Sequence, residues 1–466
     1  MFPLAWKPTE SQLSRQLSRL ILAAQFPQDI ITSKRLIIQS LTLLLLPLVA
    51  ARSSAAEDPR AAPMAQDYTV VFHNPDRERY VEGPGLVRLD DGRLLAVVPV
   101  VPRSQWSQVR RATESRVHIL HSGDGGRSWQ ELSQLSYYSA APWLHQGTLY
   151  LLANKGGTKY RNDDLLLLSS RDGGRTWSPP VTLFEGHFWN CHTGMVVQQG
   201  RFYWAVDDLA LGPKRGPRLV CADLSRNLME PSAWRISEPV PFPGFPETLT
   251  APAYAHFSSQ YLEPNVIAVR GRLRVLATVK PHRQSTAGLC AVLDVQDDGE
   301  KLGLKFTQYH PMPGGQLKFC VLWDEVSQLF WATANLVIDD QGVMDCWREG
   351  QKRGDFRGEG RSGGNDRRLL MLLYGVDGLN WFQAGCVARA GKISQSFMYA
   401  RPVIDGQDLA IIARSSINAP DQHDADHATF HRVRDFRRLA LNLYPDQEDR
   451  GPLPRDNSAH DELERQ

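Results

Sequence analysis

Polar or charged residues stand just before several apolar runs of the sequence, where a buried strand would normally carry apolar side chains. Most lie about 7–10 residues ahead of a turn, and they are Glu82, His192, Glu263, Lys318, Tyr399 and Arg401, with Tyr138 or Ser139 in the corresponding place of one further run. Carboxylate, imidazole, ammonium, phenol and guanidinium groups that met at one place would bind a polar ligand such as a carbohydrate and move protons. Each residue taken alone is equally compatible with an ordinary solvated strand end.

The elements that must position these residues are hairpins. Apolar runs flank a glycine in five places, as in LVRLDDGRLLAVV, and the glycines are Gly92, Gly147, Gly200, Gly271 and Gly406. A sixth hairpin without glycine, FCVLWDEVSQLFWAT, is expected to turn near Glu325 to Ser327. Glycine between two apolar runs is typical of a tight turn that joins antiparallel strands.

A second repeated signal follows the hairpins. SGDGGRSW (122–129) and SRDGGRTW (170–177) are nearly identical, and weaker copies contain Asp223, Asp298 and Asp377. A short Asp side chain bonds to downstream backbone amides and closes a turn, while glycine supplies a positive φ. The Trp that ends each motif is expected to anchor the turn against neighbouring strands.

The hairpins and the Asp turns alternate along the chain, and each joins two strands. Every repeat of the pattern therefore contains four strands. Such a repeat predicts an all-β, six-bladed β-propeller with four antiparallel strands per blade. The sixth hairpin has no Asp turn after it, so we expect an N-terminal strand near Tyr68 to Phe72 to complete the last blade and leave no long sheet edge exposed. Two separate β-sandwich domains are the alternative, which the shared register of the two signals disfavours.

The doubled Asp turn resembles the Asp box (BNR repeat) of the sialidase superfamily, S-x-D-x-G-x-x-W, and the resemblance covers about residues 69–440. The stretches PGGQLKFCVLWD, MYARPVIDG and HDADHATFHRVRDFR look like a bacterial family of exported, sialidase-like proteins. The Asp box is specific for the fold and not for the activity, because non-catalytic propellers also carry it.

The resemblance implies candidate catalytic residues. Glu263, in LEPNV, matches the Glu-Pro motif of the family, and Tyr399 is the candidate for the tyrosine nucleophile that sialidases use in place of a second carboxylate. A phenol, with a reference pKa of about 10, needs a neighbouring base to attack at neutral pH. Glu114 is the candidate acid/base and Glu82 its alternative, while Glu82, His192, Lys318 and Arg401 are expected to contact the substrate.

The sequence departs from the sialidase pattern in its arginines. Sialidases hold the sialic acid carboxylate with three arginines, the first from an Arg-Ile-Pro motif, where this sequence has Glu82-Gly83-Pro84. A carboxylate there would repel another carboxylate. Arg274, Lys280 and Arg283 are off register for the second arginine, and Arg401 is a candidate for one of the three.

Four functions stay open from the sequence. A sialidase-like glycoside hydrolase acting on glycan termini is favoured, because a lectin has no need of a Glu263–Tyr399 pair. A non-catalytic glycan-binding propeller and a true exo-sialidase with an altered arginine set are the alternatives. A lyase acting on uronates would require His192 and Tyr399 to work as a pair.

Other polar clusters receive simpler interpretations. His423, Asp424, Asp426, His427 and His431 form a dense cluster that could coordinate a divalent cation, but a polar loop followed by a strand is favoured, so no metal ligand and no cofactor are predicted. Asp207 and Asp208 could reach the central channel, although the start of a turn is favoured. The charged, Gly-rich stretch 348–368 is interpreted as a surface loop rather than a lid.

The ends of the chain are expected to lie outside the propeller. Residues 1–56 are interpreted as an export signal region, because Lys34 and Arg35 precede an apolar stretch (36–51) that is shorter than the roughly 20 residues of a membrane span. A linker is predicted at 57–67, the propeller at 68–444 and a disordered tail at 445–466. Six cysteines would allow three disulfides in an exported chain, but Cys290 and Cys320 sit in apolar runs typical of buried thiols.

The composition excludes several classes of protein. With 42% hydrophobic and 22% charged residues, the 466-residue chain is neither collagen-like, nor a coiled coil, nor wholly disordered. A mean hydropathy of −0.35 excludes a polytopic membrane protein, and a net charge of +2 gives no reason to expect nucleic acid or a membrane surface as partner. A monomer with a carbohydrate substrate is expected.

Overall fold

A computed structural model describes residues 62–103, 113–155, 163–189, 191–209, 215–246, 260–280, 288–337, 366–392 and 394–441. The chain divides into two compact units, Met1–Ala61 and Ala62–Gln466, and all of the described residues belong to the second. The predicted export signal, residues 57–61 of the predicted linker, the C-terminal tail and nearly all of the 348–368 stretch therefore lie outside the described residues.

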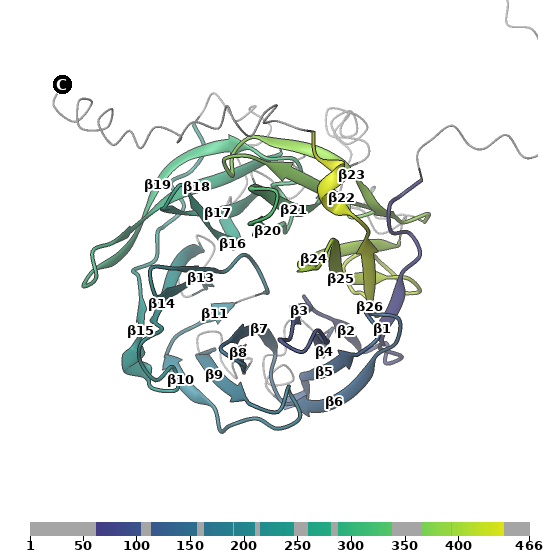
Figure 1. The fold of residues 1–466 in the computed structure, drawn as a ribbon, viewed down its shortest axis with the longest axis horizontal. Coiled ribbons are helices and arrows are strands. Elements are labelled where there is room, and N and C mark those ends of the chain that lie inside the picture. The colour runs from purple at the N-terminus through teal and green to yellow at the C-terminus, as the bar shows by residue number, and fades with distance from the viewer. Residues whose placement is uncertain are drawn as a thin grey trace, which may run out of the picture. The chain divides into compact units, whose positions relative to one another are not determined.

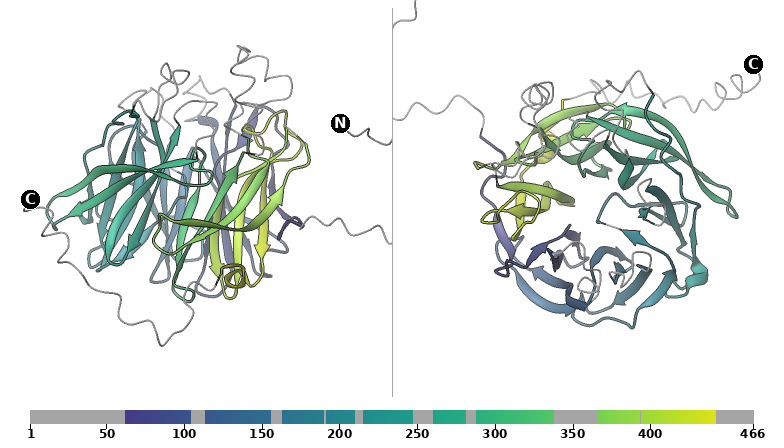
Figure 2. Two further views of the ribbon diagram at one scale, coloured as in Figure 1. Left: turned by 90° about the horizontal axis from the view of Figure 1, so that it is seen from above. Right: turned by 180° about the vertical axis from the view of Figure 1, so that it is seen from behind.

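The unit is an all-β ring of six antiparallel sheets, as predicted (Figure 1). Each sheet is one blade, and its first strand lines the central opening. The edge-on view shows the strands running from one face of the ring to the other (Figure 2).

The strands divide among the blades in chain order. Blade 1 contains β2 (Arg79–Val81), β3 (Gly85–Arg88), β4 (Leu94–Pro102), β5 (Arg116–Ser122) and β6 (Gln130–Leu135). Blade 2 contains β7 (Ser139–His145), β8 (Thr148–Asn154), β9 (Leu165–Ser170) and β10 (Val181–Phe184). Blade 3 contains β11 (Phe188–Trp189), β12 (Val196–Gln198), β13 (Arg201–Asp208), β14 (Gly216–Asp223) and β15 (Trp234–Ile236), the last preceded by the 3-10 turn η2 (Pro231–Ala233).

The remaining blades follow the same order. Blade 4 contains β16 (Gln260–Val269), β17 (Arg272–Lys280), β18 (Leu289–Asp297) and β19 (Leu302–Pro311). Blade 5 contains β20 (Cys320–Asp324), β21 (Leu329–Leu336), β22 (Leu369–Gly375) and β23 (Trp381–Arg389). Blade 6 contains β24 (Ser396–Asp405), β25 (Asp408–Ser416), β26 (His427–Val433) and the N-terminal strand β1 (Thr69–His73), and the 3-10 turn η7 (Phe436–Leu439) comes after β26.

The predicted closure of the ring is confirmed. β1 pairs with β26 and supplies the outer strand of blade 6. The residues just before it continue along blade 5, where the amides of Met64 and Ala65 donate to the carbonyls of Cys386 and Val387. The two ends of the described chain therefore hold one another, and β1 covers the edge that β26 would otherwise expose.

Six hydrophobic clusters lie between neighbouring sheets, one at each of the six contacts around the ring. The cluster between blades 6 and 1 joins Val71, Ala410 and Ile412 to Leu86 and Val98. Each blade is therefore buried on both faces, which explains the near-continuous apolar runs in the sequence.

The two predicted kinds of turn hold the strands in register. The hairpin glycines have φ values between 66° and 86°. In the Asp turns, Asp124 Oδ1 accepts from the backbone amides of Arg127 and Ser128, and Asp172 accepts in the same way in blade 2. Trp129 Nε1 donates to the Gly126 carbonyl and Trp177 Nε1 to that of Gly174, as expected of anchors.

The five cysteines among the described residues, Cys191, Cys221, Cys290, Cys320 and Cys386, are all unpaired thiols, and the sixth, Cys346, lies outside them. The preference for buried thiols at Cys290 and Cys320 is confirmed. Within the part of the chain that the structure describes, no helix is long and apolar enough to cross a membrane.

Candidate functional site

The first strand of four blades is interrupted at a predicted site residue. Glu82 lies between β2 and β3, and His192 lies between β11 and β12. Glu263 and Tyr399 lie at β-bulges within β16 and β24, where the register shifts. Because such interruptions turn a side chain out of the regular pleat, they direct these residues to a common place in the central opening, which we call the funnel.

Glu263 and Tyr399 form the central contact of the funnel. The Tyr399 hydroxyl donates to Glu263 Oε1 at 2.5 Å, across 136 residues of sequence. Thr278 Oγ1 donates to the other carboxylate oxygen at 3.4 Å, so Glu263 is held from both sides. Burial raises the pKa of Tyr399 well above its usual value, and the carboxylates of Glu263 and Glu82 raise it further. The phenol is therefore protonated at rest and has a base in contact with its proton.

Both residues of this pair have left-handed backbones, with φ of 54° at Glu263 and 51° at Tyr399. The conformation costs about 1–3 kcal/mol in a residue other than glycine and persists only where the surroundings enforce it. Each bulge also frees a backbone group from its ladder, and that group needs a new partner.

Buried charged residues supply those partners. Asp207 Oδ2 accepts from the Glu263 amide at 3.0 Å, and Lys318 Nζ donates to the Ala400 carbonyl at 2.7 Å, where Thr333 Oγ1 also donates. The preference for Asp207 as a turn residue is thus wrong: it is a fully buried part of β13, because the bulge in β16 presents an unpaired N–H to it. Lys318, predicted as a substrate contact, lies in the funnel wall with its ammonium on the backbone of the Tyr399 bulge.

The pKa of Asp207 is unusual for a carboxyl group. Burial raises it to about 7 and the Glu263 carboxylate adds to the rise, while Arg215 and the amide of Glu263 act in the opposite direction. Its second oxygen, Oδ1, is buried and has no hydrogen-bond partner among the described residues. Asp207 is therefore part of the support of Glu263 and titrates near neutral pH.

Arg414, which the sequence analysis missed, places a cation beside the phenol. It is fully buried in β25, and its Nη1 donates to Glu82 Oε1 at 2.9 Å. Its guanidinium carbon lies 4.9 Å from the ring centroid of Tyr80 and 5.1 Å from that of Tyr399. Nη2 donates to the His423 carbonyl. The Glu82 carboxylate is therefore already matched by a cation, which weakens the expectation that it repels an anionic ligand. The signal in the sequence was a charged residue inside the apolar run LAIIARSS.

Arg367 is the second cation that the sequence analysis missed. Its carbonyl accepts from the Phe397 amide, two residues before Tyr399, and its side chain is buried. Burial lowers its pKa, while Tyr399 and Glu263 act in the opposite direction. No hydrogen bond or ion pair of its guanidinium is recorded among the described residues. Arg367 belongs to the last part of the stretch 348–368, which was interpreted as a surface loop, and the burial of Asp366 and Arg367 shows that this interpretation is wrong for its described end.

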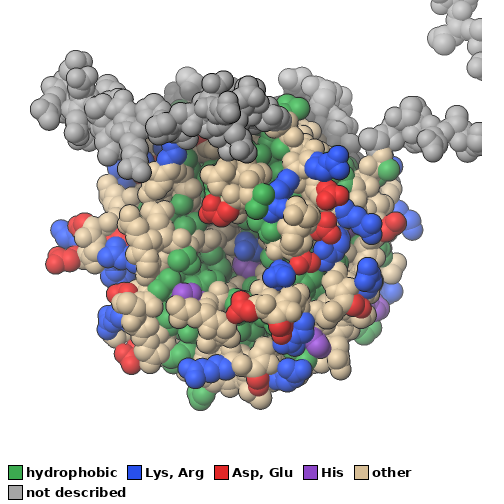
Figure 3. Space-filling view, in the orientation of Figure 1, with side chains coloured by type: hydrophobic (Ala, Val, Ile, Leu, Met, Phe, Trp, Pro, Cys, Tyr) green, Lys and Arg blue, Asp and Glu red, His purple; other side chains and the backbone are tan. Residues whose placement is uncertain are grey.

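Arg401 and His192 lie at the inner end of the funnel. Arg401 Nη1 donates to the Thr193 carbonyl at 3.0 Å and contacts Cys320 Sγ. His192 Nδ1 accepts from the Leu86 amide, and burial lowers the His192 pKa well below its usual value, so the ring is neutral. Both residues line a cavity of about 220 Å³ between the first strands of the blades. Figure 3 shows the hollow at the centre of the ring with basic and histidine side chains inside it.

Other predicted residues have partners of their own. Glu114 Oε2 lies 3.6 Å from Arg79 Nη2, and most of the loop before it (104–112) is outside the described residues. Arg274 bonds to Asp294 on the neighbouring strand, and Arg283 lies outside the described residues. His192 and Tyr399 bond to different partners, so the pair that a lyase would need shares no hydrogen bond among the described residues.

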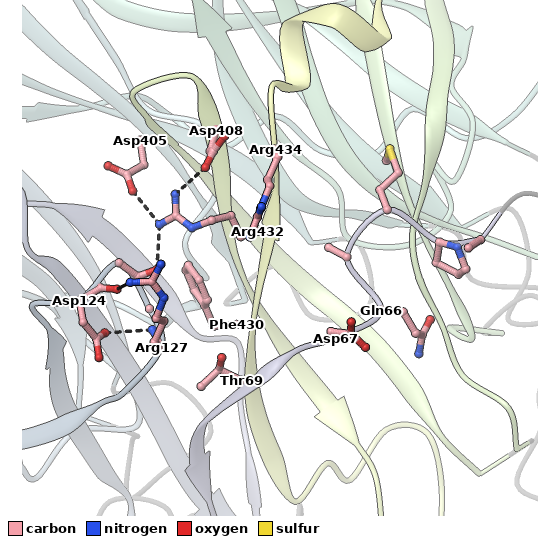
Figure 4. Close-up of a pocket in the computed structure, with 16 residues that line it drawn as sticks. Gln66, Asp67, Thr69, Asp124, Arg127, Asp405, Asp408, Phe430, Arg432 and Arg434 are labelled. Carbon is pink, nitrogen blue, oxygen red and sulfur yellow. Dashed lines mark hydrogen bonds and ion pairs between the residues drawn. The ribbon is translucent and has the colours of Figure 1, made fainter.

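The largest cavity we consider, of about 960 Å³, lies away from the funnel. It is bounded by the segment before β1, the Asp turn of blade 1 and the outer strands of blade 6 (Figure 4). Arg432 pairs there with Asp405 and Asp408, and Asp124 with the amide of Arg127. Because these charged groups are already satisfied by one another, the cavity offers less for catalysis than the funnel.

Comparison with solved structures supports the fold. A sialidase of Trypanosoma rangeli in complex with sialic acid aligns with a TM-score of 0.52 at 14% identity, over 81% of this chain and 61% of that one, which is less than two thirds of the sialidase. An α-L-arabinofuranosidase of Fusarium graminearum in complex with an iminosugar inhibitor aligns with a TM-score of 0.50 at 12% identity, over 80% of this chain and 98% of that one. A protein of unknown function from Dyadobacter fermentans gives 0.50 at 12%, over 79% and 98%.

No family model and no curated protein matches this sequence. The comparisons therefore show that the chain has a six-bladed propeller fold in common with these glycoside hydrolases, and the predicted resemblance to the sialidase superfamily is confirmed at the level of the fold.

Proposed function

We propose that the protein is a glycoside hydrolase that cleaves a terminal sugar from a glycan in the funnel. The observation that carries the proposal is the 2.5 Å contact between the half-buried Tyr399 hydroxyl and the buried Glu263 carboxylate, which stand on bulged strands of different blades. A binding module has no need of a phenol paired with a carboxylate on strained backbone, so this contact favours catalysis over binding alone.

The proposed reaction has two steps. Tyr399 Oη attacks the anomeric carbon while its proton passes to Glu263, and the glycosidic oxygen leaves after receiving a proton from a general acid. Water then attacks the glycosyl–tyrosine, the acid residue takes the proton of the water, and Glu263 returns its proton to Tyr399. Two displacements retain the configuration of the sugar. We place the general acid on the segment after β4, with Glu114 as its candidate.

A screen of aryl glycosides with the wild type, Glu263→Gln and Tyr399→Phe tests this proposal. Each variant should lose about 10²–10⁴-fold in kcat on any substrate that the wild type cleaves, because each removes one partner of the proton transfer. Tyr203→Phe is a matched control, since it removes a phenol bonded to Asp297 away from the funnel. Unchanged turnover in both funnel variants would move the site elsewhere, and ligand binding without turnover by the wild type would favour the glycan-binding alternative.

One observation favours an acidic sugar, and with it the exo-sialidase alternative. The Glu82 charge is matched by Arg414, whereas the guanidinium of Arg367, which interacts electrostatically with Tyr399 and Glu263, has no ion-pair partner among the residues that the structure describes. Paired neutral and carboxylate-bearing aryl glycosides discriminate the two classes of substrate. If the acidic substrate is preferred, Arg367→Gln should raise its KM at least tenfold and leave that of a neutral substrate unchanged. A preference for neutral sugars, with no effect of Arg367→Gln, would exclude the alternative.

We also propose that the protein is exported by residues 1–56. The apolar stretch at 36–51 and the small residues after it support the proposal. Cell fractionation followed by N-terminal sequencing tests it, and a protein that keeps its full N-terminus inside the cell would overturn it.

A further inference from the structure

A cluster at the outer edge of blade 6 plays no part in the proposed hydrolysis. His73 ends β1, His427 begins β26, and the two are directly opposite in the register of this strand pair. Asp426 precedes His427 in the chain. One ligand atom from each of the three residues lies within 4.8 Å of the others. Two imidazoles and a carboxylate are a common ligand set for zinc and related divalent transition ions.

His427, in the middle of this cluster, has a buried ring nitrogen without an aligned hydrogen bond. His427 is 7% exposed, and its buried Nδ1 has no hydrogen-bond partner among the described residues. Nδ1 lies 2.9 Å from Asp426 Oδ1, but out of line for a hydrogen bond. A ring nitrogen and a carboxylate oxygen at this distance share either a proton, as an ion pair that also lowers the pKa of Asp426, or a bound cation.

The surroundings hold two of the three residues in place. The Asp426 carboxylate accepts from the amides of Ile417 and Asn418, and its own carbonyl accepts from Asn74. The rings of His73 and His427 stack with centroids 4.4 Å apart. Ligand atoms around a tetrahedral zinc lie about 3.3 Å apart at the usual bond lengths, so the three atoms, now within 4.8 Å of one another, have to draw closer, and the exposed His73 is the residue with room to move. The exposure of His73 also leaves room for water as a fourth ligand.

We infer that His73, Asp426 and His427 form a binding site for a divalent transition ion such as Zn²⁺, which links the closing strand β1 to β26. This inference revises the prediction that the protein has no metal ligands. It also changes the ligand set weighed from the sequence: His423 bonds to Asp424 and Arg414, and His431 to Ala65 and Thr429, so neither belongs to the site. His73, more than 300 residues earlier, takes their place.

An ion at this position would stabilise the ring. The cation bridges the two strands that close the propeller, so it binds the folded state and not the unfolded chain, and the free energy of unfolding rises with the concentration of the ion. The proposed hydrolysis does not depend on the site, and the two proposals can fail separately.

The test uses the full chain, freed of metal with a chelator and titrated with Zn²⁺ by calorimetry and with Co²⁺ by visible absorption. We expect one equivalent to bind, a Co²⁺ spectrum of a four-coordinate ion, and a higher melting temperature with Zn²⁺. His73→Ala, at an exposed position that should not disturb folding, should weaken binding at least tenfold and abolish the shift in melting temperature.

His310→Ala, which removes a partly exposed histidine of blade 4, is the control and should bind as the wild type does. The inference is overturned if the wild type binds no stoichiometric ion, or if His73→Ala binds as tightly as His310→Ala.

Discussion

The backbone is strained at Glu263 and Tyr399, where a carboxylate and a phenol are held in contact. The residues that stabilise this strained backbone lie outside the contact itself. Asp207 takes up the amide that the first bulge releases, and Lys318 takes up the carbonyl that the second releases. These supports are buried charges, which are expensive unless they are paired or hydrogen-bonded. Their presence argues that the geometry of the pair, and not the stability of the strands, determines these positions.

Asp207 should make stability depend on pH. Its folded pKa of about 7 lies above the unfolded value, so the folded state holds the proton more tightly between about pH 4 and 7, and stability falls as pH rises through this window. In Asp207→Asn the amide oxygen can still accept from Glu263, and this contribution disappears. Relative to the variant, the wild type should lose up to about 1.4 kcal/mol per pH unit in the window and nothing further above it. Urea unfolding of both proteins across this range measures the difference, and parallel curves would contradict the prediction.

The contact between Glu263 and Tyr399 was predictable from the sequence, and its surroundings were not. Glu263 and Tyr399 stand in local motifs, at fixed distances before hairpin turns. Arg414 acts through Glu82, from which it is separated by 332 residues, and nothing in its own segment specifies that partner. The role of Asp207 depends on a bulge in the next blade, and a bulge has no dependable signature in a single sequence.

At the scale of the element, the two kinds of turn explain why the fold could be predicted from the sequence. Each of the two kinds of turn is formed by residues only a few positions apart: a glycine between two strands in most of the hairpins, and an Asp that bonds to the following amides in the Asp turns. Such local chemistry can be predicted without knowing the neighbours. The number of blades then followed from the number of turns, and only the contacts between blades needed the structure.

The Asp turn of blade 1 should be sensitive at one glycine and tolerant at another. Gly126 has φ of 90°, and a Cβ there would lie 2.1 Å from the ring of Phe430 in blade 6, so Gly126→Ala combines backbone strain with overpacking. We expect a loss of about 1–3 kcal/mol in the free energy of unfolding. Gly123→Ala, three residues earlier, meets no atom within 4 Å and should change stability by less than about 0.5 kcal/mol. Thermal melts of the two variants measure this, and equal effects would show that the turn does not lock the two blades together.

At the scale of the whole ring, one short strand from the start of the described chain determines whether blade 6 is complete. β1 brings Val71 into the cluster between blades 6 and 1, while Val70, its neighbour, is 45% exposed. A closed ring has no terminal blade from which unfolding can begin, since each blade is packed on both sides. A substitution that weakens the packing of β1 on blade 6 should therefore destabilise every blade.

Val71→Asp and Val70→Asp test this property with the same substitution on opposite faces of one strand. Val71→Asp buries an unpaired carboxylate and should cost several kcal/mol, whereas Val70→Asp should stay within about 0.5 kcal/mol of the wild type. Because the closure couples the blades, the near-ultraviolet signals of the buried Trp204 in blade 3 and Trp331 in blade 5 should be lost together, in a single transition at a lower temperature. If blade 6 loosened first while the signal of Trp204 kept its wild-type midpoint, β1 would be a local cover and not the strand that holds the ring closed.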